Sequence, residues 1–281
     1  MSILEAILLG IIQGLSEFIP ISSTAHLTIA GDLMGLIDPE NPERWTAFIA
    51  VIQLGTMVAV LAYFRKEIRS VPMDWLRENL TKKRKPYKKQ SNYSRLGWLI
   101  IIGSVPIVIV GLAFKDMIEG HITKEPIVIA SSLIILAVIL YIADKTARFR
   151  KDMKDLTWKD SLIVGFGQCL ALVPGSSRSG TTITAGLFLG MDRETAARFS
   201  FLLSIPAVLG SGLLEFYQSL EYLTSDSLLT LITATVFSGI SGYFAIAFLI
   251  RYLKTRSTLL FVIYRILLGL LIFYFIYTGI M

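Results

Sequence analysis

The chain has 281 residues, of which 54% are hydrophobic and only 17% are charged, and its mean hydropathy is +0.64. Because a typical soluble domain carries roughly 25% charged residues, these values argue against a soluble globular protein, a disordered chain and a collagen-like chain. One cysteine, Cys169, excludes an intramolecular disulfide framework. The apolar stretches are continuous rather than alternating, which predicts an all-α polytopic membrane protein instead of a β-barrel.

The first apolar region, 3–30, is interrupted midway by the sequence PISST at 20–24. Non-helical backbone at membrane depth is tolerated only where it is buried in protein or lines a wet cavity. The region is therefore predicted to be a re-entrant helix–loop–helix element. No Lys or Arg precedes Arg44, so the basic segment of a secretory signal peptide is missing, and we expect this region to stay in the mature protein.

Six continuous apolar stretches have the length of about 20 residues that a helix needs to cross the hydrocarbon core. They are 45–64, 96–114, 126–143, 199–217, 228–250 and 257–280. A second interrupted region, 161–190, lies between the third and fourth stretches and is broken by the sequence PGSSRSG at 174–180. The predicted fold is therefore a polytopic bundle of six transmembrane helices plus two re-entrant helix–loop–helix elements.

The basic residues are distributed unevenly between the predicted loops. Of the 27 Lys and Arg residues, 22 lie in 65–95, 144–160, 190–198 and 251–256, and three lie in 31–44, 115–125 and 215–227. By the positive-inside rule the first group of loops faces the cytoplasm, which makes 65–95 a basic cytoplasmic loop. A nucleic-acid patch at 82–89 is the less favoured interpretation because this charge lies beside membrane spans, so no nucleic-acid partner is expected.

The two interrupted regions resemble each other. The motif Gly-x-x-Gln at 10–13 recurs at 165–168, and Pro-x-Ser-Ser at 20–23 recurs at 174–177, with a one-residue offset between the two parts. Each region is followed by three spans, so the halves would lie in opposite orientations, as in an inverted-topology repeat. Chance matching of Gly, Pro and Ser is the alternative. The chain then forms one integral membrane domain, 1–281, with halves of approximately 1–143 and 161–281.

The second interruption has the composition of an oxyanion site. Glycines permit close backbone approach, the helix that follows offers free N–H groups and a positive dipole end, and the Arg178 guanidinium matches phosphate oxygens. Hydroxyl side chains surround it, at Ser176, Ser177, Ser179, Thr181, Thr182 and Thr184. The alternative is a helix-packing contact with Arg178 in a buried salt bridge.

The first interruption carries groups suited to metal binding and catalysis. Gln13 and Glu17 are four residues apart on one helix face, and oxygen ligands of this kind suit Mg²⁺ or Ca²⁺ held jointly with phosphates. Ser23 and His26 are three residues apart, and a histidine within reach of a serine acts as its base or as an acid. The alternatives are a structural Glu17 paired with Arg178 and a hydrogen-bonded packing role for His26.

Three other ionisable residues complete this list. His121 is assigned to the surface of an outer loop, so a phosphatase with two catalytic histidines is disfavoured, and a serine nucleophile or a metal-activated water fits better. Glu5 and Arg265 lie inside apolar regions, where ionisable residues are costly. Both are left unassigned, and a structural role as a partner within the bundle is one option for either.

Three motifs together resemble the signatures of the undecaprenyl-diphosphatase family of bacterial bacitracin-resistance proteins. They are Gln13-x-x-x-Glu17, Ser22-Ser23-x-x-His26 and Pro174-Gly175-x-Ser177-Arg178-Ser179-Gly180-x-Thr182. The segment 197–206 (ARFSFLLSIP) is also similar to that family, and the resemblance covers the whole chain. It implies hydrolysis of undecaprenyl diphosphate to undecaprenyl phosphate and inorganic phosphate, which recycles the carrier lipid for peptidoglycan and confers bacitracin resistance.

The resemblance also implies roles for single residues. Glu17, with Gln13, binds a divalent metal, Mg²⁺ or Ca²⁺, and the diphosphate. Ser23 is the nucleophile and His26 assists it, with metal-bound water as the alternative nucleophile. The phosphates are held by Ser177, Arg178, Ser179 and Thr182.

The same resemblance places the protein in the bacterial inner membrane as a multi-pass protein with its site open to the outer, periplasmic face. Its partners are a polyprenyl diphosphate lipid and the membrane lipids, and homo-oligomerisation is left open. The competing hypothesis is a transporter that flips a polyprenyl phosphate lipid, because inverted repeats with broken helices commonly perform alternating access. A carrier needs groups that bind the lipid but no nucleophile, so the Ser23, His26 and Glu17 set favours the enzyme.

Overall fold

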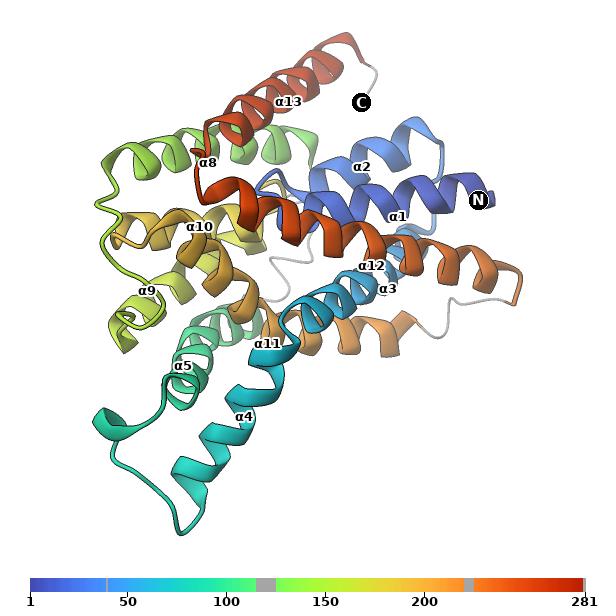
Figure 1. Cartoon of the computed structure of the whole chain (residues 1–281). Helices are drawn as coiled ribbons and strands as arrows, with labels where there is room; N and C mark the ends of the chain where they lie inside the picture. The colour runs from blue at the N-terminus through green and yellow to red at the C-terminus, as the bar shows by residue number, and fades with distance from the viewer. Residues whose placement is uncertain (39, 115–124, 220–224, 280–281) are drawn as a thin grey trace.

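The computed structural model describes residues 1–38, 40–114, 125–219 and 225–279. His121 and almost all of the predicted outer loop 115–125 lie outside these residues. The described part is helical and contains no β-strand (Figure 1). Its α-helices are α1 (Ile3–Phe18), α2 (Ser23–Leu33), α3 (Pro42–Tyr63), α4 (Arg65–Leu80), α5 (Asn92–Ala113), α8 (Pro126–Thr146), α9 (Trp158–Cys169), α10 (Arg178–Phe188), α11 (Arg193–Ser219), α12 (Ser225–Leu253) and α13 (Leu259–Thr278), joined by the short 3-10 helices η1 (Tyr87–Lys89) and η2 (Leu170–Leu172).

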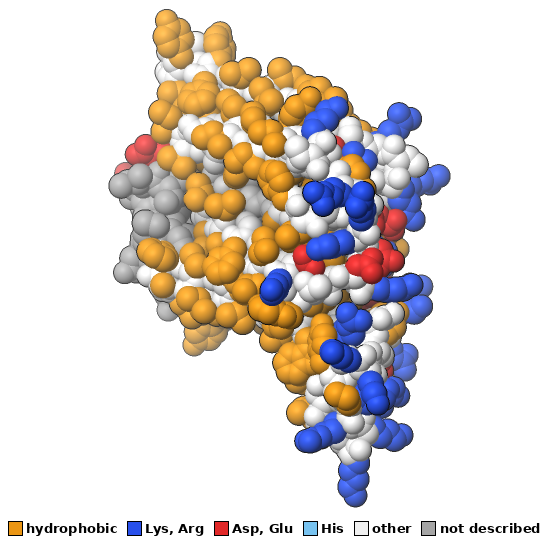
Figure 2. Space-filling view, turned by 90° about the vertical axis from the view of Figure 1, so that its left-hand side faces the viewer, with side chains coloured by type: hydrophobic (Ala, Val, Ile, Leu, Met, Phe, Trp, Pro, Cys, Tyr) orange, Lys and Arg blue, Asp and Glu red, His pale blue; other side chains and the backbone are white. Residues whose placement is uncertain are grey.

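Six of these helices contain a stretch long and apolar enough to cross a membrane. The stretches are Arg44–Tyr63, Asn92–Ala113, Pro126–Thr146, Arg193–Leu214, Leu228–Leu253 and Leu259–Thr278. Hydrophobic side chains cover most of the face shown in Figure 2, whereas Lys and Arg gather along one side of it and over a narrow projection. The six predicted spans are therefore confirmed.

The segment 65–95, predicted only as a loop, contains a helix of its own. Helix α4 follows α3 directly, with Phe64 between them. Ile68 and Val71 pack against the buried core, and Trp75 packs edge-on against Trp98 of α5 with ring centroids 5.1 Å apart. This spacing of three and four residues is typical of a helix. The prediction from hydropathy missed α4 because the segment contains many charged residues.

Both interruptions are breaks between helices, and proline causes each break. Ile19 and Val173 have extended backbone, because the residue before a proline is disfavoured in the helical conformation. After each break a serine with positive φ, Ser22 at 75° and Ser177 at 65°, caps the new helix. Ser22 follows Gln13 at the same separation as Ser177 follows Gln168. When the two capping serines are aligned with each other, the one-residue offset between the motifs is not needed.

The two broken units pack in corresponding ways. Helix α1 crosses α12, and helix α9 crosses α5. A Cβ on Gly10 would lie 2.3 Å from the carbonyl oxygen of Ala234, and a Cβ on Gly165 would lie 2.3 Å from that of Gly103. Both crossings therefore require glycine for close backbone approach. The inverted repeat and the re-entrant placement in the membrane stay predictions.

Candidate active site

A cavity of about 550 Å³ lies between the two breaks. Its polar wall comes from both breaks and from α3, and includes Ser16, Glu17, Ser22, Ser23, Thr24, Gln53, Ser177 and Arg178. Its apolar wall comes largely from the C-terminal parts of α5 and α11, and includes Ile107, Val108, Leu112, Pro206, Val208 and Leu214. The cavity therefore joins a polar pocket to an apolar groove.

The carboxylate of Glu17 is the centre of the polar wall. Its Oε1 accepts a hydrogen bond from Arg178 Nη2 at 2.9 Å, which is also an ion pair. Its Oε2 accepts from Ser23 Oγ at 2.9 Å and from Gln13 Nε2 at 3.2 Å. Glu17 is only 8% exposed, so the structure brings four of the predicted residues together around one buried acid. The pairing with Arg178 foreseen as the structural alternative is present too.

Of the three adjacent hydroxyl residues at the first break, Ser23 is the one bonded to this carboxylate. Ser22 is used as the helix cap, where its Oγ accepts from the amide of Ala25. Thr24 is exposed and lines the cavity. A serine hydroxyl that already donates to a carboxylate has a base in place to take its proton, so the geometry favours Ser23 as the nucleophile.

His26 lies close to Ser23 in sequence but is bonded elsewhere. Its Nδ1 lies 2.7 Å from the carbonyl oxygen of Ser22, and its Nε2 lies 2.6 Å from the hydroxyl of Tyr264 on α13. The two rings are stacked, with centroids 5.5 Å apart. Since a carbonyl oxygen only accepts, Nδ1 carries the proton and Nε2 accepts from Tyr264. Both ring nitrogens are thus engaged away from Ser23, and neither His26 nor Tyr264 is among the residues that line the cavity. The sequence analysis missed Tyr264 as the partner of His26.

The predicted phosphate-binding residues divide into two groups. Ser177 and Arg178 line the cavity, and Nη1 of Arg178 has no hydrogen-bond partner among the described residues. Ser179 and Thr182 are almost fully buried behind them. Thr182 Oγ1 lies 2.6 Å from Ser200 Oγ of α11, and Ser179 Oγ lies 3.2 Å from Ser177 Oγ. These two residues hold the loop in place, whereas the first two face the space where a phosphate would bind.

Arg265 lies immediately behind this loop and is fully buried. Its Nη2 donates to the carbonyl oxygen of Ser176 at 3.0 Å, while Nε and Nη1 have no partner among the described residues. A Cβ on Gly180 would lie 2.7 Å from Nη1, so the guanidinium presses against the start of α10. The sequence analysis left Arg265 unassigned, although it is one of only two arginines inside the apolar regions.

The family model described as bacitracin resistance protein BacA matches residues 6–271. The chain belongs to this family. A protein named undecaprenyl-diphosphatase from Syntrophobacter fumaroxidans is 57% identical over 96% of this chain and 95% of the relative. Relatives of the same name from Chlorobium phaeobacteroides and Myxococcus xanthus are 49% and 48% identical, over 96% and 99% of this chain and 95% and 91% of those proteins.

The site of this BacA-family protein contains oxygen atoms that a divalent metal could use as ligands. Gln13 Oε1 is buried and has no hydrogen-bond partner among the described residues, so one amide oxygen is available beside the Glu17 carboxylate. No cluster of three His, Cys, Asp or Glu side chains occurs in the part of the chain that the structure describes. The site therefore fits an ion such as Mg²⁺, which keeps several waters and binds through one or two protein oxygens plus substrate phosphates.

Proposed function

We propose that this protein is an undecaprenyl-diphosphatase that removes the terminal phosphate of undecaprenyl diphosphate. The observation that carries the proposal is the contact of Ser23 with Glu17, which is paired with Arg178, at the polar end of a cavity whose other end is apolar. The names of the relatives give the same activity for those proteins. The product is the monophosphate carrier lipid used for peptidoglycan and other envelope glycans.

The chemistry follows from the contacts of Ser23. Its Oγ attacks the terminal phosphorus, the bond from that phosphorus to the bridging oxygen breaks, and Glu17 takes the hydroxyl proton. Prenyl monophosphate leaves, and water then hydrolyses the phosphoserine to release inorganic phosphate. Arg178, which lines the cavity, stabilises the charge on the transferring group, because preorganised donors in a water-poor site lower the barrier most.

The cavity also fits the lipid tail. Its apolar wall lies on α5 and α11, both of which are membrane-spanning helices. A diphosphate placed against Arg178 would leave its prenyl chain among Val108, Leu112 and Leu214. The substrate would then keep its tail in an apolar environment throughout the reaction.

The position of the cavity supports an opening toward the outer, periplasmic face of a bacterial inner membrane. Helix α5 begins beside the basic segment 82–89, and α11 begins near Arg193 and Arg198. The cavity uses the opposite ends of both helices. Because the basic ends belong on the cytoplasmic side, the site would open on the other side.

We further propose that the divalent cation, Mg²⁺ or Ca²⁺, binds with the diphosphate and not to the protein alone. Glu17 and Gln13 Oε1 would hold it from the protein side. When bound, the ion supplies charge neutralisation of the diphosphate oxygens. The neutral Gln13 would then contribute a single ligand to the cation, its amide oxygen.

Phosphate release in detergent tests this function. The purified protein is given a long-chain prenyl diphosphate with Mg²⁺ or Ca²⁺, and inorganic phosphate is measured with and without a chelator. We expect release that the chelator abolishes and the added metal restores. No release under any metal condition would refute the enzyme, and lipid transfer between leaflets without release would favour the carrier, which has no use for the Ser23–Glu17 contact.

A further inference from the structure

The segment between α3 and α5 forms a hairpin that projects from the body of the bundle (Figures 1 and 2). We call the residues 65–98 the basic hairpin. One arm is α4 and the other is the start of α5, and the two arms meet at Trp75 and Trp98. Gly97 is required there, because its Cβ would lie 2.9 Å from Trp75 Cδ1. The hairpin is thus a packed element, not a flexible linker.

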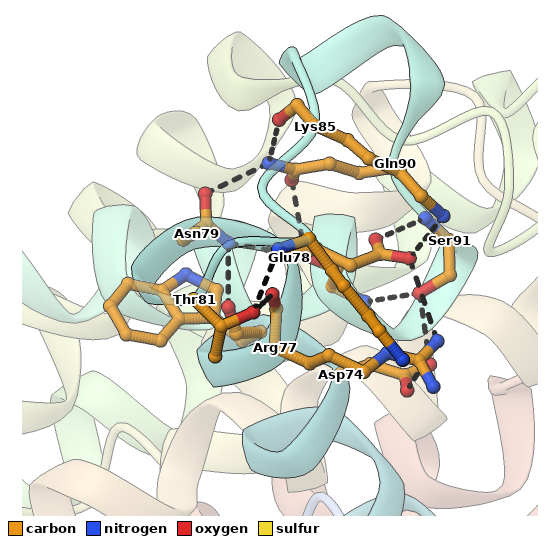
Figure 3. Close-up of polar contacts among 11 residues, drawn as sticks. Asp74, Arg77, Glu78, Asn79, Thr81, Lys85, Gln90 and Ser91 are labelled. Atoms are coloured by element: carbon orange, nitrogen blue, oxygen red, sulfur yellow. Dashed lines mark hydrogen bonds and ion pairs between the residues drawn. The ribbon is translucent and has the colours of Figure 1, made fainter.

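A buried acid fixes the turn of the hairpin (Figure 3). The Glu78 side chain is 1% exposed and accepts from Lys85 Nζ at 2.7 Å and from the amide of Ser91 at 2.7 Å. The Lys85 ammonium and the Ser91 amide hold the pKa of this carboxyl below its usual value. Gln90 adds a bond from Nε2 to Asn79 Oδ1 at 2.8 Å. The turn is consequently held in one shape by these bonds, and the contribution of the Glu78 carboxylate weakens as the pH falls through its lowered pKa.

This shape leaves most of the basic residues of the turn unpaired. Lys85 is neutralised by Glu78. Five other basic residues between 82 and 89 are exposed and form no ion pair with any described acidic side chain; they are Lys82, Lys83, Arg84, Lys88 and Lys89. Like charges held so close repel one another. The fixed turn therefore presents positive charge to a negative surface outside the protein.

An apolar stripe runs along α4 toward the same turn. Met73, Leu76 and Leu80 are 59%, 49% and 69% exposed. Their spacing of three and four residues places them on one face of the helix. An exposed apolar face ending in a basic cluster is the pattern of a helix that lies in a membrane interface. A nucleic acid would bind the basic residues but would leave this stripe in water.

We propose that the basic hairpin docks on the anionic leaflet of the membrane that contains the protein, with the apolar stripe in the interface and the five unpaired basic residues on lipid phosphates. The occupant is an anionic phospholipid such as phosphatidylglycerol. Charge complementarity and the position of the hairpin beside the ends of α3 and α5 support this occupant. The proposal does not depend on the reaction catalysed in the cavity.

The test uses the full-length protein in lipid nanodiscs with spin-labelled phosphatidylglycerol or phosphatidylcholine. The association of each lipid is measured by electron spin resonance for the wild type and two variants. The test variant replaces Lys82, Lys83, Arg84, Lys88 and Lys89 with Gln. The control variant makes the same change at five exposed basic residues on the same side of the protein, Lys145, Arg150, Lys154, Lys159 and Arg256. Both variants lower the net charge equally, and neither set belongs to the cavity.

We expect the wild type to select phosphatidylglycerol and the test variant to lose this selectivity by at least about fivefold, since one basic residue near an anionic surface strengthens binding about fivefold. The control variant should keep most of it. A salt concentration of 0.5 M should weaken the selectivity of the wild type by screening. Equal losses in the two variants, or no selectivity in the wild type, would overturn the proposal.

A second measurement locates the stripe. A nitroxide is attached to Leu80→Cys in a Cys169→Ala background, and its collisions with oxygen and with a water-soluble nickel chelate are compared in nanodiscs. In discs that contain phosphatidylglycerol the label should be reached by oxygen and shielded from the chelate. A label open to the chelate in every lipid would contradict docking, as would tight RNA binding that the test variant abolishes.

Discussion

The two broken helices share their local geometry but differ in their surroundings. Both breaks follow a proline, and both new helices start from a serine with positive φ, Ser22 or Ser177. In α10, eight of eleven residues are buried, whereas in α2 only three of eleven are. The second break is thus a platform enclosed by α8, α9 and α11, and the first break is the more accessible of the two.

The difference in burial separates two chemical tasks. The enclosed break contributes Arg178 and Ser177, which face the cavity from a loop held by Thr182 and Arg265. The accessible break contributes Ser23, held against Glu17. A binding loop gains from rigid surroundings because preorganised donors cost nothing to reorient during the reaction. In the proposed mechanism, one local motif thus supports binding in one half of the chain and bond formation in the other.

The largest expected loss of activity comes from substitutions of Ser23 and Glu17 at the first, more accessible break. Ser23→Ala removes the attacking oxygen and Glu17→Gln removes its base, so each should lower kcat for phosphate release by about 10³-fold or more. The double variant should be no worse than either single one, because the two groups act as a unit. Thr24→Ala, at the exposed neighbouring hydroxyl, is the control. Turnover retained in Ser23→Ala would transfer the attack to another hydroxyl or to water.

Substitutions of Arg178 and of Arg265, which lies behind the enclosed break, should differ in their effect on stability. Arg178→Met and Arg265→Met should each lower kcat/KM by about 10²-fold, the first by loss of phosphate stabilisation and the second by loss of the bond to Ser176 that holds the loop. Arg178→Met should also lower the free energy of unfolding the more, by about 3 kcal/mol, because it leaves the buried Glu17 carboxylate without its charged partner. Stability measured by thermal unfolding in detergent separates the two. Equal destabilisation by both changes would show that the bond from Arg265 Nη2 to Ser176 stabilises the fold as much as the pair of Arg178 with Glu17.

A smaller effect is expected at the contact between His26 and Tyr264. If His26 orients the start of α2, then His26→Ala and Tyr264→Phe should each lower kcat by about tenfold or less, and the double variant should match the single ones. The two changes break the same hydrogen bond. A loss of about 10³-fold in His26→Ala with no loss in Tyr264→Phe would instead assign His26 a direct role in the proton transfer.

The smallest expected effect is at Gln168, which corresponds to Gln13 in the second motif and does not line the cavity. Gln168 occupies the place of Gln13 in the second motif, but it is fully buried and its amide has no hydrogen-bond partner among the described residues. Gln168→Leu should therefore raise the free energy of unfolding by about 1 kcal/mol and leave activity unchanged. Gln13→Leu, at the bonded counterpart, should lower activity instead. A destabilised Gln168→Leu variant would show that this amide has a partner.

Much of the fold could be predicted, because the six spans follow from hydropathy and length. The pairing of Glu17 with Arg178 could also be expected, since ionisable residues in apolar regions pair with one another. Ser23 could be expected nearby because it lies only six residues after Glu17. The sequence does not show which distant residues become the partners of His26 and Arg265. Tyr264 is 238 positions from His26, and Arg265 gains its role from carbonyl groups that every residue carries. Such contacts depend on how distant helices pack.

The bond between Arg178 and Glu17 joins residues 161 positions apart in the chain. Contacts at such separation form late, because the intervening segment must first be ordered. During synthesis, α1 and α2 are made long before α10, so the Glu17 carboxylate beside Ser23 has no arginine partner until α10 has been made. Phosphatase activity is thus a sensitive reporter of complete assembly. A chain expressed as two fragments, cut between α8 and α9, would regain activity only when the fragments find each other.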